Sequence, residues 1–162
     1  MCCSLRRLDP TKDREVYQQV FGWEADYPRW LRDAEKACGV GLDEWLGLGQ
    51  LERRADIAVY DPELAAMFSI HFDRGPKIFE AHVWAKRRTS LATLVEAADQ
   101  LISSATNHLG MRAFYVWIAK RNVPIKRLCD RIGCVADGTM IDGESHGRPI
   151  EWQRMTWINP HG

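Results

Sequence analysis

The chain has 162 residues, of which 46% are hydrophobic and 27% are charged, the balance of an ordinary globular protein rather than a disordered one. This length suits one domain, spanning residues 1–162, that buries a full core without help from disulfides or metals. Its 22 basic and 22 acidic residues cancel, so neither nucleic acid nor an anionic membrane is an expected partner.

The cysteines and histidines do not form the patterns of a disulfide framework or a metal site. Five cysteines, an odd number without a Cys-x-x-Cys pair, suit a reducing cytoplasm. The five histidines are scattered, so we expect no metal. No stretch approaches the roughly 18 apolar residues of a membrane-spanning helix, and no apolar run marks a signal peptide. We therefore expect a cytoplasmic protein.

The first third of the chain is predicted to hold one short strand followed by helices. The strand covers 4–8, and an Asp-Pro-Thr turn leads into a helix at 13–21. A second helix is expected at 27–37, with a continuation at 42–48 after the glycine-containing break at 39–41. The tryptophans and tyrosines of this segment are interpreted as core residues that pack the helices.

From residue 55 the sequence pattern changes to strands. Three strands are predicted, at 56–60, 63–72 and 77–85. The last two are joined by a turn at 73–76, which contains a glycine and a proline. This part of the chain therefore supplies consecutive strands of one sheet.

Apolar residues at steps of three and four predict the clearest helix of the chain, over 91–109. Thr89 or Ser90 can cap its first turn, and Gly110 can end it. A strand rich in aromatic and β-branched residues follows at 111–119. Strand, helix and strand within about forty residues form a βαβ unit, so this strand should run parallel to the one before the helix.

A second, shorter helix is predicted between Asn122 and Gly133, entered directly from that strand. Asn122 fits the N-cap, where its side-chain oxygen can accept a backbone N–H, and Pro124 has no N–H to leave unpaired in the first turn. Three apolar residues form one stripe: Ile125, Leu128 and Ile132. Gly133 can take the left-handed conformation that ends a helix. Two last strands, near 139–142 and 150–158, flank a polar loop.

The spacing of residues in this short helix resembles a known family. The GCN5-related N-acetyltransferases, the GNAT superfamily, have a strand–helix segment similar to Asn122-x2-Ile125-x2-Leu128-Cys129-x3-Gly133-Cys134. The predicted order of strands and helices matches their fold over nearly the full length. The resemblance implies an α/β (α+β) fold in which a mixed twisted sheet has a central βαβ unit and flanking helices. It also implies acetyl-CoA as cofactor and a primary amine of a small molecule or protein as acceptor.

Basic residues precede the helix at 91–109. A helix N-terminus offers unpaired N–H groups and a positive dipole end, which suit a phosphate. GNAT enzymes hold the pyrophosphate of coenzyme A with the pattern Gln/Arg-x-x-Gly-x-Gly/Ala, and the stretch from Arg87 to Ala92 is similar except that Ser90 replaces the first glycine. The resemblance implies these coenzyme A-binding residues: Val83, Ala85, Arg87, Arg88, Thr89, Ser90, Ala92 and Asn122. The alternative is a solvated basic loop with an ordinary N-cap.

Two ionisable residues, Glu80 and His82, share one face of the strand at 77–85. Ser69 and His71 of the neighbouring strand should lie on the same face. Such a group could take the proton that an amine must lose before it attacks a thioester. Because GNAT enzymes often use a glutamate on this strand as general base, Glu80 is the first catalytic candidate and His82 the second. The alternatives are a solvated glutamate and a histidine of the partial core.

Cys129 occupies the place where many GNAT enzymes carry a tyrosine that protonates the departing thiolate. A thiol, with an ordinary pKa of about 8.5, could serve as this acid. Tyr115 on the preceding strand is an alternative donor. The competing interpretation is that Cys129 is a small hydrophobic residue of an apolar helix.

Two other functions compete with catalysis. A GNAT-fold protein without activity could be a structural or interaction protein of a phage or prophage, with virion proteins as partners, and Ser90, Cys129 and Cys134 depart from the enzyme pattern in that direction. A DNA-binding helix-turn-helix would need a second helix after Gly133, but glycine and proline interrupt that region.

The acceptor cannot be read from the sequence. Glu24, Asp26 and Glu144 could attract a cationic amine, although solvated surface carboxylates are the simpler interpretation. The C-terminal strand, with its two tryptophans, permits a homodimer.

Overall fold

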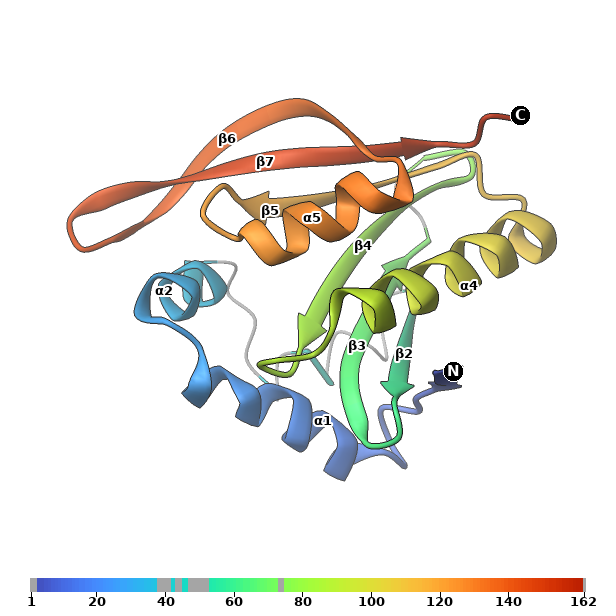
Figure 1. Cartoon of the computed structure of the whole chain (residues 1–162), viewed down its shortest axis with the longest axis horizontal. Helices are drawn as coiled ribbons and strands as arrows, with labels where there is room; N and C mark the ends of the chain where they lie inside the picture. The colour runs from blue at the N-terminus through green and yellow to red at the C-terminus, as the bar shows by residue number, and fades with distance from the viewer. Residues whose placement is uncertain (1–2, 38–41, 43–44, 47–52, 73–74, 162) are drawn as a thin grey trace.

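The structure is a computed structural model that describes residues 3–37, 42, 45–46, 53–72 and 75–161. The described residues form a mixed seven-stranded sheet with helices on both of its faces (Figure 1). The strands are β1 (Ser4–Arg7), β2 (Arg54–Tyr60), β3 (Leu64–His71), β4 (Ile78–Ala85), β5 (Ala113–Ala119), β6 (Val135–Ser145) and β7 (Arg148–Ile158). The helices are α1 (Arg14–Gly22), the 3-10 helix η1 (Trp23–Asp26), α2 (Arg29–Ala37), α4 (Leu91–Leu109) and α5 (Val123–Ile132).

The strand order confirms the predicted βαβ unit. The sheet runs β1-β2-β3-β4-β5-β7-β6, and β4 pairs with β5 in parallel across the α4 connection. The other neighbouring pairs are antiparallel. A parallel pair therefore lies inside an otherwise antiparallel sheet, which is the mixed α/β architecture that the sequence predicts.

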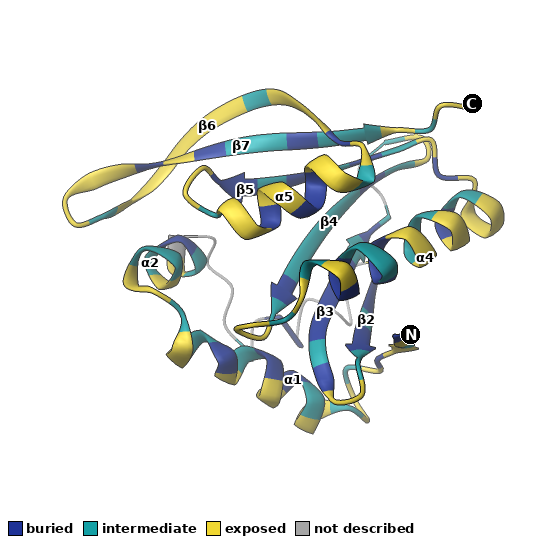
Figure 2. Ribbon diagram, in the orientation of Figure 1, coloured by how far each residue is buried: buried dark blue, intermediate teal, exposed yellow. Residues whose placement is uncertain are grey.

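The two faces of the sheet carry different helices. On one face, α4 and α5 bury Leu94 and Leu128 against Phe68 of β3. On the other face, α1 buries Tyr17 with the neighbouring β3 residue Met67. Successive residues of a strand point to opposite faces, so β3 is covered on both sides, as the dark blue of its ribbon in Figure 2 shows.

A buried polar network joins α1 to the sheet. The carboxylate of Asp56 accepts hydrogen bonds from Tyr17 Oη at 2.5 Å and from Ser69 Oγ at 2.6 Å. Arg54 Nε lies 3.0 Å from Asp56 Oδ1, and its guanidinium covers the ring of Trp45 at 4.0 Å. Burial, followed by the hydrogen bond to Asp56, raises the pKa of Tyr17 far above its usual value. The network therefore holds a charged pair inside the core, in which the Asp56 carboxylate has partners on both oxygens while Arg54 Nη1 has no hydrogen-bond partner among the described residues.

Most element boundaries agree with the prediction to within two residues, from the first strand to α5. The caps of α4 are confirmed: Ser90 Oγ accepts the backbone N–H of Thr93 at 3.1 Å, and Gly110 has a φ of 65°. Gly133 ends α5 with a φ of 93°. The 3-10 helix η1 is not predicted from the sequence. The predicted helical segment 42–48 lies mostly outside the described residues.

The predicted capping hydrogen bond of Asn122 is wrong. Asn122 stands at the N-cap of α5, but its side chain makes no capping hydrogen bond and its ψ is 71°. Because an N-cap side chain bonds to the second or third helical N–H, Pro124 at the second position removes one of the two donors. The helix begins instead on the backbone, where Lys126 N donates to Asn122 O at 3.1 Å.

The C-terminal region is one long hairpin, β6–β7, rather than short strands around a polar loop. A tight turn at His146 and Gly147, with φ values of 54° and 74°, joins the two strands. Since β6 begins at Val135, directly after Gly133 and Cys134, the second helix of a helix-turn-helix does not exist and that hypothesis is wrong. None of the helices among the described residues is long and apolar enough to cross a membrane.

Candidate active site

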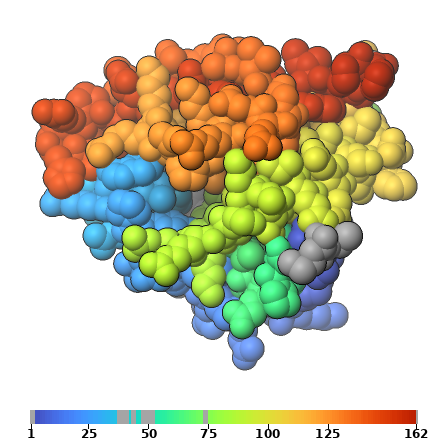
Figure 3. All heavy atoms as spheres, viewed as in Figure 1, coloured from blue at the N-terminus to red at the C-terminus, as the bar shows by residue number. Residues whose placement is uncertain are grey.

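The two parallel strands diverge halfway along their length. Their register pairs Ile78 with Ala113, Phe79 with Phe114 and Glu80 with Tyr115, and no further pair joins these two fully described strands. Beyond that point β4 stays paired to β3, and β5 stays paired to β7. The sheet therefore opens between β4 and β5 toward their C-terminal ends. Figure 3 shows a recess where α2, α5 and the loop before α4 meet.

A cavity of about 70 Å³ fills this opening. Its walls come from β4, β5, β7, α2 and the start of α5, and consist of Leu31, Ala34, Glu35, His82, Val83, Trp84, Val116, Trp117, Ile118, Ala119, Asn122, Ile125 and Trp152. Most of these side chains are apolar or aromatic. Among the described lining residues, the ionisable ones are Glu35 and His82.

The structure brings Glu80 and His82 together, but only His82 lines the cavity. His82 Nε2 lies 3.4 Å from Glu80 Oε1, and Tyr115 Oη donates to Glu80 Oε2 at 3.2 Å. The predicted shared face is confirmed, because Ser69 lies opposite His82 and His71 opposite Glu80 in the β3–β4 register. Glu80 therefore contacts the cavity through His82.

The basic junction before α4 is a fixed turn. Thr89 Oγ1 donates to Lys86 O at 2.7 Å and to Ala65 O of β3 at 3.0 Å. Arg88 has a φ of 72°, the left-handed conformation of a tight turn, and both Arg87 and Arg88 are exposed. The turn thus presents two guanidinium groups beside the N-terminus of α4.

Ser90, which replaces a glycine of the family pattern, is the N-cap of α4, and its hydroxyl makes the capping hydrogen bond. It accepts from Thr93 N and lies 2.8 Å from Thr93 Oγ1, which in turn contacts Asp61. The next residues, Leu91 and Ala92, begin the helix, where backbone N–H groups have no helical partner. An anion at this junction would therefore meet backbone N–H groups and arginines more directly than the serine hydroxyl.

Three further predicted coenzyme A-binding residues lie along the opening. Val83 and Asn122 line the cavity. Ala85 ends β4, and its carbonyl oxygen accepts a hydrogen bond from Tyr27 Oη at 3.0 Å. Since Asn122 makes no capping bond, its side chain can serve the cavity instead.

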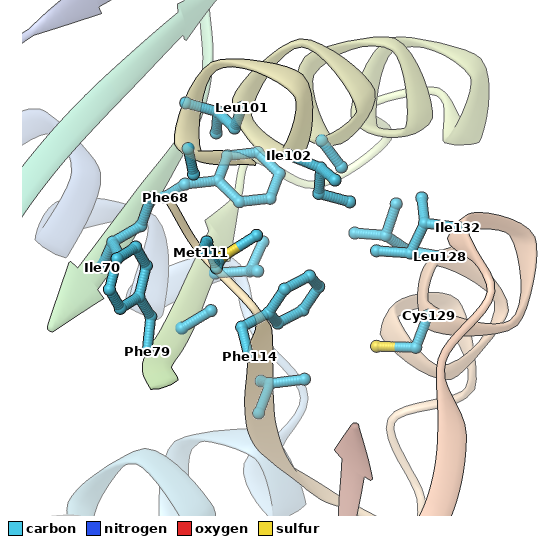
Figure 4. Close-up of a pocket in the computed structure, with 15 residues that line it drawn as sticks. Phe68, Ile70, Phe79, Leu101, Ile102, Met111, Phe114, Leu128, Cys129 and Ile132 are labelled. Carbon is cyan, nitrogen blue, oxygen red and sulfur yellow. The ribbon is translucent and has the colours of Figure 1, made fainter. Parts of the chain in front are cut away.

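Cys129 is not brought to this cavity. It is 3% exposed and lines a separate, wholly apolar hollow of about 50 Å³ between the sheet, α4 and α5, shown in Figure 4. Its thiol is hydrogen-bonded to that of Cys134, and this contact together with burial raises the pKa of Cys134 far above its usual value. The surroundings are those of a core residue.

Glu35 is the cavity residue that the sequence analysis does not single out. It lies on α2, one helical turn after Leu31, and its side chain is half-buried. Burial first, and the negative charge of Glu24 second, raise the pKa of Glu35 from 4.5 to about 7. Its place in a helix is readable from the sequence, but the packing of that helix against the β4–β5 opening is not.

A wide groove adjoins the cavity on the side of the β6–β7 hairpin. It shares Ala119 with the cavity wall and has a volume of about 780 Å³. Several of its lining residues are basic or polar: Lys120, Arg121, Ser145, His146 and Arg148. The groove thus meets the cavity wall at Ala119, the last residue of β5.

No metal site accompanies this arrangement: the described residues contain no cluster of three or more histidine, cysteine, aspartate or glutamate side chains that could hold an ion. The site chemistry that these residues offer is binding of an anion at the α4 junction and proton transfer at Glu35 and His82.

Comparison with known proteins supports the fold. No protein-family model and no curated protein matches the sequence. Among solved structures, the chain is similar to the RimL ribosomal L7/L12 alpha-N-protein acetyltransferase in complex with coenzyme A, with a TM-score of 0.75, 15% identity and coverage of 98% of this chain and 94% of that one.

Two other solved structures give the same result. The yncA protein from Salmonella typhimurium with its cofactor acetyl-CoA has a TM-score of 0.71 and 16% identity, covering 100% of this chain and 97% of that one. An acetyltransferase of the GNAT family from Streptococcus pneumoniae has a TM-score of 0.71 and 13% identity, covering 97% and 99%. At these identities the likeness concerns the fold, over nearly the whole of each chain.

Proposed function

We propose, because this chain has the GNAT fold, that it is an N-acetyltransferase that moves the acetyl group of acetyl-CoA to a primary amine. The observation that carries the proposal is the opening between β4 and β5. Its cavity is lined by two ionisable residues, Glu35 and His82, and the arginines before the N-terminus of α4 lie at its edge. Solved structures of the same fold hold acetyl-CoA or coenzyme A, which supports a cofactor of this class here.

The residues along the opening fit coenzyme A. Arg87 and Arg88, with the backbone N–H groups at Ser90 and Ala92, would hold the pyrophosphate, because a cationic turn and a helix N-terminus both attract phosphate. The diverging strand beside Val83 and Ala85, together with Asn122, would face the pantetheine arm. When bound, the cofactor supplies an acetyl group activated as a thioester.

His82 is the proposed proton-transfer residue on the β4 wall, and Glu80 is its positioning residue. His82 lines the cavity, whereas Glu80 lies behind it at 3.4 Å and is itself held by Tyr115. A carboxylate that contacts an imidazole fixes the orientation of the ring. The geometry supports no proton-donor role for Cys129, which is buried beside the separate apolar hollow and does not line the cavity.

Calorimetric titration with acetyl-CoA tests the proposal. We expect the wild-type protein to bind in the micromolar range, and Arg87→Ala to bind roughly tenfold more weakly, because a charge-assisted hydrogen bond contributes about 1.5–3 kcal/mol. Arg112→Ala is the matched control, since Arg112 is exposed and precedes β5 at the end of the strand away from the cavity. Absence of binding up to millimolar acetyl-CoA would overturn the proposal.

A further inference from the structure

Glu35 is fixed in the cavity wall by a helix that is held on two sides. Ala34, 1% exposed, packs α2 against Ala119 of β5 and Trp152 of β7. Asp33 accepts a hydrogen bond from Ser145 Oγ of the β6–β7 hairpin at 2.7 Å. Because residues around Glu35 are anchored in this way, its backbone has a defined position relative to the β4–β5 opening.

The described surroundings of Glu35 supply no cation. The cavity is lined by apolar and aromatic side chains such as Trp84, Trp117 and Ile125, and its described lining residues include no lysine or arginine. Among the described residues, no hydrogen bond or ion pair reaches the Glu35 carboxylate. A carboxylate that is taken out of water without a partner is costly. A ligand that carries a positive charge would remove this cost.

We propose that Glu35 binds the ammonium group of the acceptor and accepts its first proton, so that the substrate class is a primary alkylamine that is cationic at neutral pH. The inference rests on the proposed acetyl transfer and adds to it a recognition residue and a substrate class. Both groups line the cavity, Glu35 from α2 and His82 from β4. The reacting nitrogen lies between these two groups.

The electrostatics around Glu35 agree with this role. The titratable groups that face Glu35 are Glu24 of η1, Tyr27 directly after η1, and His82 of β4. Within the described residues, β5, α5 and β7 add no charged side chain to the cavity. Burial and Glu24 raise the pKa of Glu35 to about 7. This value lies closer to that of an alkylammonium group, about 10.4 for lysine, so the proton transfer is less unfavourable than it is to an ordinary carboxylate.

The protons and bonds of the reaction balance. The ammonium gives one proton to Glu35, which returns it to solvent after the turnover. The neutral amine forms the new N–C bond to the acetyl carbon, and the C–S bond of the thioester breaks. The second amine proton leaves through His82 and ends on the sulfur of the released coenzyme A.

The test compares two amines across a range of pH. Butylamine is cationic at neutral pH, whereas aniline is already neutral and needs no base to expose its lone pair. For Glu35→Gln we expect kcat/KM for butylamine to fall roughly 100-fold or more, with loss of the rise in rate near pH 7. For aniline we expect a change of only a few-fold. Acetyl-CoA affinity should not change, and Glu15→Gln on the exposed side of α1 should behave as wild type.

Each other outcome separates this inference from the acetyl-transfer proposal. A wild-type protein that binds no acetyl-CoA overturns the acetyl transfer itself. If the protein binds acetyl-CoA but does not acetylate butylamine, the assigned substrate class is wrong. Equal losses on butylamine and aniline, or an unchanged pH profile in Glu35→Gln, mean that Glu35 has only a structural role.

Discussion

Two carboxylates that are withdrawn from solvent, Asp56 and Glu35, have opposite surroundings. Asp56 of β2 is 3% exposed and accepts hydrogen bonds from a tyrosine, a serine and an arginine. Glu35 of α2 faces aromatic walls and a second carboxylate, Glu24, with no cation from the described residues of the cavity. The first carboxylate has its partners within the protein, and the second has no hydrogen-bond or ion-pair partner among the described residues.

The contrast between the partners of Asp56 and Glu35 separates a structural carboxylate from a candidate functional one. A satisfied charge stabilises a unique arrangement of helix and sheet, and its removal damages the whole fold. A carboxylate in a cavity without a partner lowers stability, and such a group is a candidate for a functional site. Asp56 is therefore interpreted as structural and Glu35 as functional, and the following predictions sharpen or break that division.

The largest expected effect is on the Asp56 side. Asp56→Ala leaves the buried guanidinium of Arg54 without its carboxylate and removes the acceptor of Tyr17 and Ser69. We expect the free energy of unfolding to fall by about 3–5 kcal/mol, measured by urea denaturation. Asp137→Ala is the control, since Asp137 is exposed and its pair with Arg154 lies at the surface, where ion pairs contribute little. Similar losses in both variants would contradict the structural assignment of Asp56.

The next effect has the opposite sign. The pKa of Glu35 is raised from 4.5 to about 7 in the folded protein, so stability falls as pH rises through this window, where the folded state keeps a proton that the unfolded chain has lost. Glu35→Gln removes this loss. At pH 8 we expect the variant to be more stable by on the order of 1–3 kcal/mol, and at pH 4 to equal the wild type. A variant that is less stable at pH 8 would show that Glu35 is held by partners of its own.

Glu80 lies between the two cases, because it has partners and also contacts a cavity residue. Glu80→Gln keeps the shape of the side chain but removes the charge beside His82. We expect the acetylation rate at neutral pH to fall about tenfold and the pH–rate profile to shift, measured as thiol release from acetyl-CoA. An unchanged profile would remove Glu80 from the mechanism.

The smallest expected effect concerns Glu24, whose charge raises the pKa of Glu35. Glu24→Gln should lower that pKa, and the fall of stability with pH should therefore end at a lower pH and be smaller in total. The gain in stability at pH 8 is roughly 0.5 kcal/mol or less, measured by thermal unfolding at several pH values. In the Glu35→Gln background the same substitution should have no such effect.

Local features of the fold are predictable from the sequence because they depend on neighbouring residues. The stripe of α4, its Ser90 cap and its Gly110 end follow from residues within a few turns. The shared face of Glu80 and His82 follows from strand alternation. The capping bond of Asn122 fails because one residue, Pro124, removes a donor, and the length of the β6–β7 hairpin depends on pairing across a turn.

The cavity itself depends on contacts between distant segments. The divergence of β4 from β5 and the approach of α2 both depend on distant residues, since Ala34 of α2 packs with Ala119 of β5, 85 positions further along the chain. A pattern that is read along the chain contains no signal for such an approach. The sequence therefore predicts the β4 side of the site and leaves the α2 side to the structure.

Thermal unfolding with and without acetyl-CoA tests the central claim most directly, because a ligand that binds the folded state must raise its unfolding midpoint. We expect the unfolding midpoint to rise with acetyl-CoA concentration in wild type and in Glu35→Gln, and to rise less in Arg87→Ala. A midpoint that does not move at millimolar acetyl-CoA would contradict an acetyl-transfer site between β4 and β5 and favour a protein that keeps the fold without the activity.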